Sequence, residues 1–208
     1  MSMNFNELNN LQLDVLREIG NIGSGNAVTA LAKMINRKVD MAVPKVKILE
    51  FNRVNEILGE PEIIVVGILL DVSGDLSGSI LFVLDQKSAW ILIDMLFKRN
   101  TDTENTESFN EIEISALKEI GNIVTGAYLS AISTLTNLYI TYSVPDIAID
   151  MAGAILSVPA IEFGKLGDTV LYIETEFAEG SSKVQGDFFL IPDIDSYEVL
   201  LRALGVVS

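Results

Sequence analysis

The chain has 208 residues, with 14 basic and 29 acidic side chains and a formal net charge of −15, which disfavours nucleic acid and anionic lipid surfaces as partners. It contains no cysteine and no histidine, which excludes disulfides, thiolate nucleophiles, Ser-His-Asp triads and zinc sites built from thiolate or imidazole. No apolar run reaches the length of a membrane helix and the N-terminus lacks a signal-peptide pattern, so we expect a soluble cytoplasmic protein.

The first half of the chain predicts one long helix, three strands and one short helix. The long helix covers Phe5–Asn36, with Asn4 as a candidate N-cap, and the polar stretch Lys98–Ser108 marks the end of this half. Between them we expect three strands and then the short helix over Val39–Phe51, Ile63–Val72, Ser79–Leu84 and Lys87–Phe97.

The second half predicts the same elements in the same order. Its long helix covers Glu111–Leu138, with Asn110 as a candidate N-cap. The segment Asp150–Gly164 has no counterpart in the first half; we interpret it as an apolar insertion that is helical as far as Pro159. The remaining strands and the closing helix are expected over Tyr139–Ile149, Thr169–Phe177, Val184–Ile191 and Ser196–Ala203.

The two halves form an internal repeat. Leu16–Leu31 (LREIGNIGSGNAVTAL) matches Leu117–Ile132 (LKEIGNIVTGAYLSAI) at an offset of 117 − 16 = 101. The same offset relates Pro44 to Pro145, which we expect near strand starts or on edge strands because proline cannot donate to a ladder. We therefore expect one domain over residues 1–208, built from two repeats at about 5–100 and 109–206.

Each long helix has an apolar side and a narrow polar stripe. At about 100° per residue, the members of a stripe lie within roughly 60° of its glutamate. Long helices usually cover exposed positions with Lys, Glu, Arg or Gln, whereas these stripes contain Asn, Ser and Gly, and Gly costs about 1 kcal/mol relative to Ala. The stripes comprise Asp14, Glu18, Asn21 and Gly25, and Ser115, Glu119, Asn122 and Gly126; the apolar sides comprise Leu13, Leu16, Ile19 and Ala27, and Leu117, Ile120 and Tyr128.

Two interpretations of the stripes are open. The glycines allow close helix packing, with the Glu and Asn merely solvated, or the bare positions let the backbone of another protein approach. Recurrence of Glu-x-x-Asn while neighbours such as Gly23 and Val124 differ favours the second interpretation.

Other motifs are weak. The GNIGSGN segment lacks the Gly-Lys-Ser/Thr of a phosphate loop. A glycosidase pair formed by Asp14 and Glu18 fails in the second copy, where Ser115 replaces the aspartate. The segment DVSGDLSG lacks the terminal glutamate of a calcium loop and predicts a hairpin turn, and Trp90 is expected in the core.

The pattern Asp/Ser-x-x-x-Glu-x-x-Asn, with a proline 23 positions after the asparagine, occurs twice and resembles the CheC/CheX/FliY family of chemotaxis phosphatases, which act on phosphorylated CheY. The resemblance covers essentially the whole chain, and two intact copies are typical of the CheC branch. It implies an α/β (α+β) fold with pseudo-two-fold symmetry. In this fold an antiparallel-rich sheet formed by both repeats carries the two long motif helices.

The resemblance also implies roles for the stripe residues. Asn21 and Asn122 orient the attacking water, while Glu18 and Glu119 pair with a lysine of CheY; Asp14, Ser115, Gly25 and Gly126 contact CheY. Glycines at 20, 25, 121 and 126 would let the CheY site come close. The regulator would bring Mg²⁺, so no cofactor or metal site of the chain's own is expected.

The receptor deamidase CheD is implied as a second partner. We expect it on a helical face formed by Asp150, Met151, Ile155 and Leu156, with a buried helix as the alternative. Two rival functions stay open: a non-catalytic adaptor that regulates CheD or the flagellar switch by binding alone, and a hydrolase of small phosphorylated metabolites.

Overall fold

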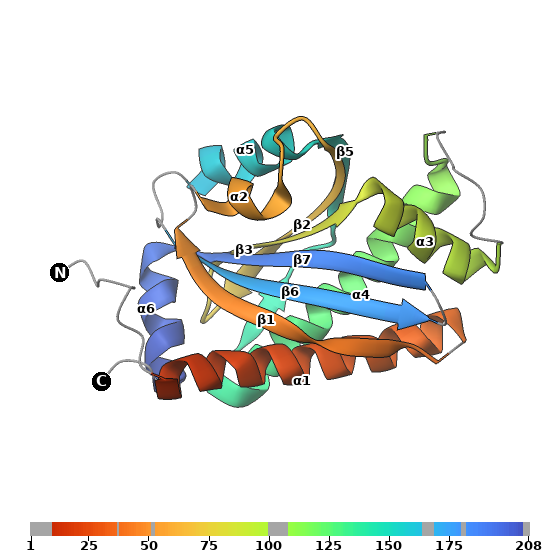
Figure 1. The fold of residues 1–208 in the computed structure, drawn as a ribbon. Coiled ribbons are helices and arrows are strands. Elements are labelled where there is room, and N and C mark those ends of the chain that lie inside the picture. Colours follow the sequence, from red (N-terminus) through yellow and green to blue (C-terminus); the bar gives the residue numbers. More distant parts are fainter. Residues whose placement is uncertain are drawn as a thin grey trace.

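The structure, a computed structural model, describes residues 10–36, 38–50, 53–99, 108–163, 169–179 and 182–205. Both halves contain a long helix, an edge strand, a further helix, a β-hairpin and a closing helix, in that order (Figure 1). The first half comprises α1 (Asn10–Ile35), β1 (Asp40–Glu50), α2 (Val54–Leu58), β2 (Ile64–Gly74), β3 (Gly78–Asp85) and α3 (Gln86–Phe97). The second comprises α4 (Glu111–Thr136), β4 (Ile140–Tyr142), β5 (Asp146–Met151), α5 (Ala152–Phe163), β6 (Thr169–Glu179), β7 (Ser182–Pro192) and α6 (Ile194–Ala203).

One antiparallel, seven-stranded sheet runs through both halves in the order β1-β6-β7-β3-β2-β4, with β5 also paired to β2. Each repeat lends its edge strand to the other, because β1 pairs with β6 whereas β4 and β5 pair with β2. Strands β1, β6 and β7 correspond to β4, β2 and β3 of the other repeat, so the strand order reads the same from either edge of the sheet. The register of the central pair, β7 with β3, has the same symmetry. Leu81 pairs with Phe189 at its centre, and the Gly78–Pro192 and Leu84–Gly186 pairs lie at equal distances on either side. The antiparallel-rich fold with pseudo-two-fold symmetry that the family resemblance implies is therefore confirmed.

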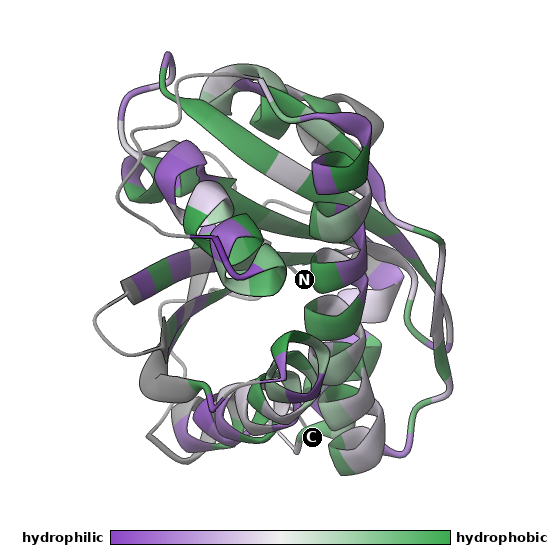
Figure 2. Ribbon diagram, turned by 90° about the vertical axis from the view of Figure 1, so that its right-hand side faces the viewer, coloured by the Kyte–Doolittle hydropathy of each residue, from purple (hydrophilic) through white to green (hydrophobic). Residues whose placement is uncertain are grey.

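The two faces of the sheet carry layers of different size: the face with the larger hydrophobic cluster is called the thick side and the other face the thin side. On the thick side α1, α3, α4 and α6 pack on the strands, and the ring of Phe82 stacks on that of Phe188 with centroids 4.2 Å apart. On the thin side α2 and α5 bury a smaller cluster that includes Val54, Leu156 and Phe189. Hydrophobic and hydrophilic residues alternate along the helices, as one buried and one exposed side require (Figure 2).

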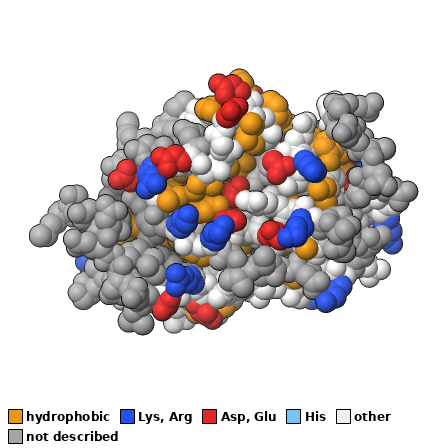
Figure 3. All heavy atoms as spheres, in the orientation of Figure 1, with side chains coloured by type: hydrophobic (Ala, Val, Ile, Leu, Met, Phe, Trp, Pro, Cys, Tyr) orange, Lys and Arg blue, Asp and Glu red, His pale blue; other side chains and the backbone are white. Residues whose placement is uncertain are grey.

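Part of the thin side is not covered by α2 and α5 and is polar. Ion pairs link neighbouring strands there, with Lys45 Nζ 3.0 Å from a Glu174 carboxylate oxygen and Lys183 Nζ 2.8 Å from Glu176. Basic and acidic side chains lie next to one another on the face drawn in Figure 3. Because such pairs are exposed to water, each contributes at most about 1 kcal/mol to stability. None of the helices in the described ranges combines the length and apolar run that crossing a bilayer requires.

The two prolines related by the repeat, Pro44 and Pro145, lie at the edges of the sheet, as predicted. Pro44 lies in edge strand β1, where the pairing with β6 shifts register between Ala42 and Lys45. Pro145 separates β4 from β5 on the opposite edge. Interruptions of this kind protect an edge strand from pairing with other chains. The predicted β2–β3 hairpin and the buried Trp90 are also confirmed.

The interpretation of Asp150–Gly164 as an insertion is wrong. Its first two residues complete strand β5, and α5 occupies the position between edge strand and hairpin that α2 occupies in the first half. The helix also continues through Pro159 to Phe163. A proline inside a helix costs roughly 3 kcal/mol, and burial of Ala152, Ile155 and Leu156 against the sheet offsets that cost.

Candidate functional site

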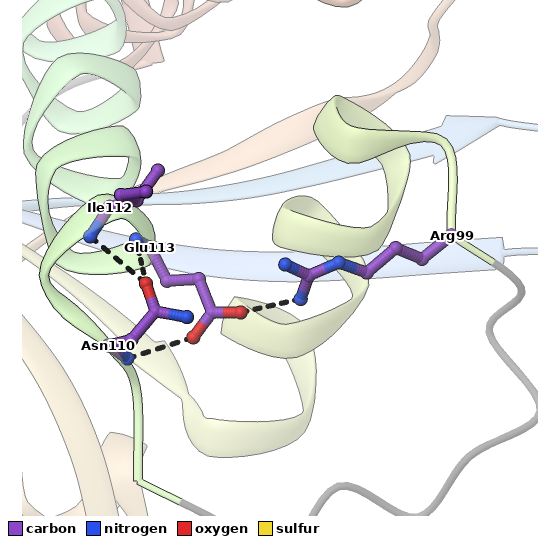
Figure 4. Close-up of polar contacts among 4 residues, drawn as sticks. All are labelled: Arg99, Asn110, Ile112 and Glu113. Atoms are coloured by element: carbon purple, nitrogen blue, oxygen red, sulfur yellow. Dashed lines mark hydrogen bonds and ion pairs between the residues drawn. The ribbon is translucent and has the colours of Figure 1, made fainter.

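The second motif helix, α4, is anchored firmly at its start. Asn110 is its N-cap, as predicted, and accepts hydrogen bonds from the backbone N–H groups of Ile112 and Glu113 at 3.0 and 3.1 Å (Figure 4). The Glu113 carboxylate accepts from the Asn110 N–H at 2.9 Å and pairs with Arg99, which follows α3. Burial alone raises the pKa of Glu113, but the hydrogen bonds from Arg99 and Asn110 outweigh it and hold the pKa below its usual value.

Both motif helices end in the same way. Asn36 and Asn137 follow α1 and α4 and adopt left-handed backbone conformations, with φ of 54° and 56°. Asparagine tolerates this conformation better than most residues, and it commonly terminates a helix. The two positions are 137 − 36 = 101 residues apart, so the repeat extends to the helix ends. The predicted N-cap of the first helix, Asn4, lies outside the described residues.

The structure places the polar stripes outward and the apolar sides inward. In α4, Leu117, Ile120 and Tyr128 are at most 1% exposed, and in α1 Ile19 and Ala27 are fully buried. The predicted apolar sides are thus confirmed, except that the side chains of Leu13 and Leu16 lie outside the description. All four residues of the first stripe, Asp14, Glu18, Asn21 and Gly25, are exposed; in the second, Ser115 and Glu119 are exposed, and Asn122 and Gly126 are half-buried.

The glycines on the buried side of the motif helices, such as Gly23 and Gly121, allow neighbouring elements to pack closely. A Cβ atom on Gly23 would lie 2.9 Å from Cε1 of Tyr128 and 3.1 Å from its Cα, so Gly23 lets α1 approach the backbone of α4. A Cβ on Gly121 would lie 2.7 Å from Cδ1 of Ile68 on β2. Gly20 is also buried. The expectation that Gly20 and Gly121 open the surface to another protein is therefore wrong, because both are buried, and Gly121 is packed closely against Ile68.

The stripe glycines, Gly25 and Gly126, have different surroundings in the two copies. Where a Cβ of Gly25 would stand, no atom from elsewhere in the described part of the chain lies within 4 Å. The corresponding space at Gly126 is taken by the hydroxyl group of Tyr142, whose Cζ lies 3.1 Å away. Tyr142 belongs to β4 and is 42% exposed. Sequence reasoning missed this residue because nothing in the α4 motif indicates which strand residue covers it.

The glutamates and asparagines of the stripes are not engaged by the described parts of the chain. No hydrogen bond or ion pair joins the side chains of Glu18, Asn21, Glu119 or Asn122 to any residue within the described ranges. Asp14 pairs with Arg17 at 2.9 Å, but both side chains are 63% exposed, so the pair contributes little stability. The four Glu and Asn side chains are thus available to an incoming molecule.

The described residues hold no group of three or more acidic side chains suited to binding a metal ion. A pocket of about 650 Å³ lies beside the C-terminal half of α1, and none of the stripe residues lines it. Its lining consists of Val28, Thr29, Ala32, Lys33, Asn36, Lys38 and Val39.

The expected docking face on residues 150–156 does not form. Asp150 and Met151 are exposed, but they lie in strand β5 rather than on the helix. Ile155 and Leu156 are only 6% and 5% exposed and belong to the core beneath α5. The prediction is wrong for these two side chains, because their helical spacing reflects contact with the sheet.

Comparison with known proteins agrees with this geometry. The sequence model of the CheC-like family matches residues 11–48 and 112–149, which cover all but the first residue of each motif helix. The chain is 36% identical to the CheY-P phosphatase CheC of Bacillus subtilis over 204 residues, 97% of each protein. It is 31% identical over 140 residues to the flagellar motor switch phosphatase FliY of the same organism, covering 67% of this chain and 36% of that protein.

Solved structures show the same fold. FliY from Thermotoga maritima superposes with a TM-score of 0.75 and 25% identity, covering 95% of this chain and 98% of that one. A chain in the crystal structure of a FliG–FliM complex from H. pylori reaches a TM-score of 0.69 at 15% identity, covering 92% of this chain and 98% of that one, which shows the fold alone. The family match, the near full-length similarity to a CheC protein and the paired motif helices establish that this chain belongs to the CheC-like family.

Proposed function

We propose that this chain is a phosphatase that hydrolyses the aspartyl phosphate of the response regulator CheY. The main supporting observation is that each long helix presents, on one outward stripe, an exposed Glu and an Asn three residues later. The side chains of both residues make no hydrogen bond or ion pair with the described residues. Support comes from the 36% identity over nearly the whole chain to a protein named CheY-P phosphatase.

Asn21 and Asn122 are the residues we assign to the attacking water. An amide donates one hydrogen bond and accepts another, so it can hold a water molecule in a fixed orientation. With the water in line, its oxygen forms a new bond to phosphorus while the bond from phosphorus to the aspartate oxygen breaks. The products are the free aspartate carboxylate and inorganic phosphate, which retains both protons of the water. Such catalysis by positioning needs neither histidine nor cysteine.

Glu18 and Glu119 are assigned to docking. Each lies three residues before its asparagine on the same exposed stripe, within reach of the same partner surface. A carboxylate there pairs with a lysine of the regulator and sets the register of the complex. We further propose that the regulator brings its own Mg²⁺ as part of the substrate.

The position of the stripes favours a protein over a small molecule as substrate. Small-molecule sites are concave and enclose most of the ligand. Glu18 and Asn21 instead lie on the exposed side of a helix, and the pocket beside α1 is lined by other residues. A receiver protein that carries its own concave phosphorylation site complements such a helix face.

A phosphate-release assay tests the proposal. Phosphorylated CheY should lose phosphate faster with the protein than without it, at catalytic amounts of protein. A non-catalytic adaptor predicts no acceleration, and a general hydrolase predicts turnover of free acetyl phosphate without CheY, so either result would contradict the proposal.

Binding of the receptor deamidase CheD, which rests on the family resemblance, and a cytoplasmic location, which rests on the sequence pattern, are part of the same proposal. Within the predicted CheD segment, Asp150 and the 44%-exposed Met151 on edge strand β5 are the side chains left for contact. Met151→Asp should weaken CheD binding in a pull-down with purified proteins while the protein stays folded. Unchanged binding would place the CheD interface elsewhere.

A further inference from the structure

Tyr142 completes the polar stripe of the second motif helix. Its backbone is fixed by the pairing of β4 with β2, where Tyr142 lies opposite the buried Val72. From there its side chain reaches α4, and its hydroxyl oxygen occupies the place that a side chain at Gly126 would fill. A strand residue thus supplies the group that the helix itself lacks.

Along the stripe, the Tyr142 hydroxyl follows Glu119 and Asn122, the residues proposed to dock CheY and to hold the attacking water. Glu119, Asn122 and Gly126 follow one another along one helix face, and Asn122 and Gly126 are one turn apart, about 6 Å along the axis. With Tyr142 at 126, the outward stripe presents a carboxylate, an amide and a phenol. Tyr142 is 42% exposed, so a docked protein that reaches Asn122 also meets the phenol.

We propose that Tyr142 is a substrate-binding residue of the second site, where its hydroxyl donates a hydrogen bond to an acceptor oxygen of docked CheY. This inference rests on the proposed phosphatase function. The sequence offset of 101 places Met41 at the corresponding position of the first copy, and methionine has no hydroxyl to donate. The two sites therefore differ in the strength with which they bind the regulator.

The test isolates the second site. The variant Glu18→Lys/Asn21→Ala closes the first site, and Tyr142→Phe is then added, which removes the hydroxyl and keeps the ring. We expect a rise in KM for phosphorylated CheY of about 2- to 10-fold, the range of one hydrogen bond, with kcat within about twofold. Gly126→Ala, which displaces the phenol from the stripe, should raise KM similarly.

Tyr139→Phe is the matched control, because Tyr139 is 69% exposed and contacts the β2–β3 hairpin at Gly74 rather than the stripe. It should leave KM unchanged. Thermal melting should show that Tyr142→Phe folds like its parent, since the ring is retained. An unchanged KM in Tyr142→Phe would overturn the inference while leaving the phosphatase proposal intact.

A binding measurement separates the two proposals. If the protein with a closed first site releases no phosphate, the proposed activity fails for the second site. Binding of CheY that carries beryllofluoride on its aspartate, measured by calorimetry, then reports on Tyr142 directly. A Kd raised 2- to 10-fold by Tyr142→Phe supports the contact, and an unchanged Kd overturns it.

Discussion

The two motif helices carry the same polar stripe in different surroundings. In α1, Asn21 is exposed and no described atom from elsewhere in the chain fills the space at Gly25. In α4, Asn122 is half-buried and Tyr142 lies against Gly126. The repeat has kept the outward Glu and Asn while the neighbouring surface has changed. Under the proposed function, this difference gives two sites with the same chemistry and unequal access.

The same contrast holds at the helix–helix contact. Gly23 of α1 is held against Tyr128 of α4, whereas the corresponding pair, by the offset of 101, is Val124 and Ala27. A large side chain faces a glycine in one pair, and two medium or small ones make up the other. Ala27, Val124 and Tyr128 belong to one core cluster, so the two copies of the motif fill the same core with side chains of different size.

The largest expected effect on stability is at Gly23. Gly23→Ala places a methyl group against the ring and backbone of Tyr128, and overpacking of this kind costs about 1–3 kcal/mol. Urea denaturation monitored by circular dichroism gives the free energy of unfolding. A Gly23→Ala protein as stable as wild type would show that α1 and α4 are not in such close contact.

The next largest effect on stability is expected at the start of α4, where Glu113 is bonded to Arg99 and Asn110. Glu113→Gln should lower stability at neutral pH by about 1–2 kcal/mol, because the charge-assisted hydrogen bonds to Glu113 are weakened. The folded pKa of Glu113 is depressed, so its contribution is present above the unfolded value and is lost as pH falls through the folded one. Urea midpoints of both proteins should therefore converge as the pH falls below the usual pKa of a glutamate. A gap that stayed constant with pH would argue against this anchor.

A smaller effect of opposite sign is expected at Gly25. Gly25→Ala should raise stability by up to about 1 kcal/mol, because the position is exposed and helical. The added methyl group would also keep CheY away from the first site. Measured with Asn122→Ala to silence the second site, phosphate release should fall on the order of tenfold, equivalent to about 1.4 kcal/mol. A gain in stability without loss of activity would show that CheY does not approach Gly25 closely.

The smallest effect is expected from single asparagine changes. If the sites act independently and equally, Asn21→Ala or Asn122→Ala alone leaves about half of the phosphate release. Unequal access at the two sites makes the two losses differ. Steady-state rates over a range of CheY concentrations compare them. Complete loss from either single change would contradict independent sites.

Much of the fold was predictable because the repeat doubles the signal. Long helices, hairpin strands and edge prolines follow from periodicity and from the limits of proline, and Asn110 follows from capping chemistry. The role of α5 did not follow, because Pro159 signals a helix end and only the sheet beneath Ile155 and Leu156 outweighs that signal.

The candidate site was predictable in part. Helical spacing places Glu18 and Asn21 on one outward face, and the structure agrees. Helical spacing alone does not distinguish a glycine that permits close packing, such as Gly121, from a stripe glycine such as Gly126. The distinction depends on which element of the fold lies opposite each glycine. Tyr142 was beyond sequence reasoning because it reaches the stripe of helix α4 from strand β4.

The most direct test of the account is phosphate release from phosphorylated CheY by the double variant Asn21→Ala/Asn122→Ala. Both changes lie on exposed or half-buried helix positions, so the protein should fold and still bind CheY. We predict a loss on the order of 10²-fold or more, because the water is no longer positioned at either site. A double variant that dephosphorylates CheY at the wild-type rate would contradict catalysis by these two stripes.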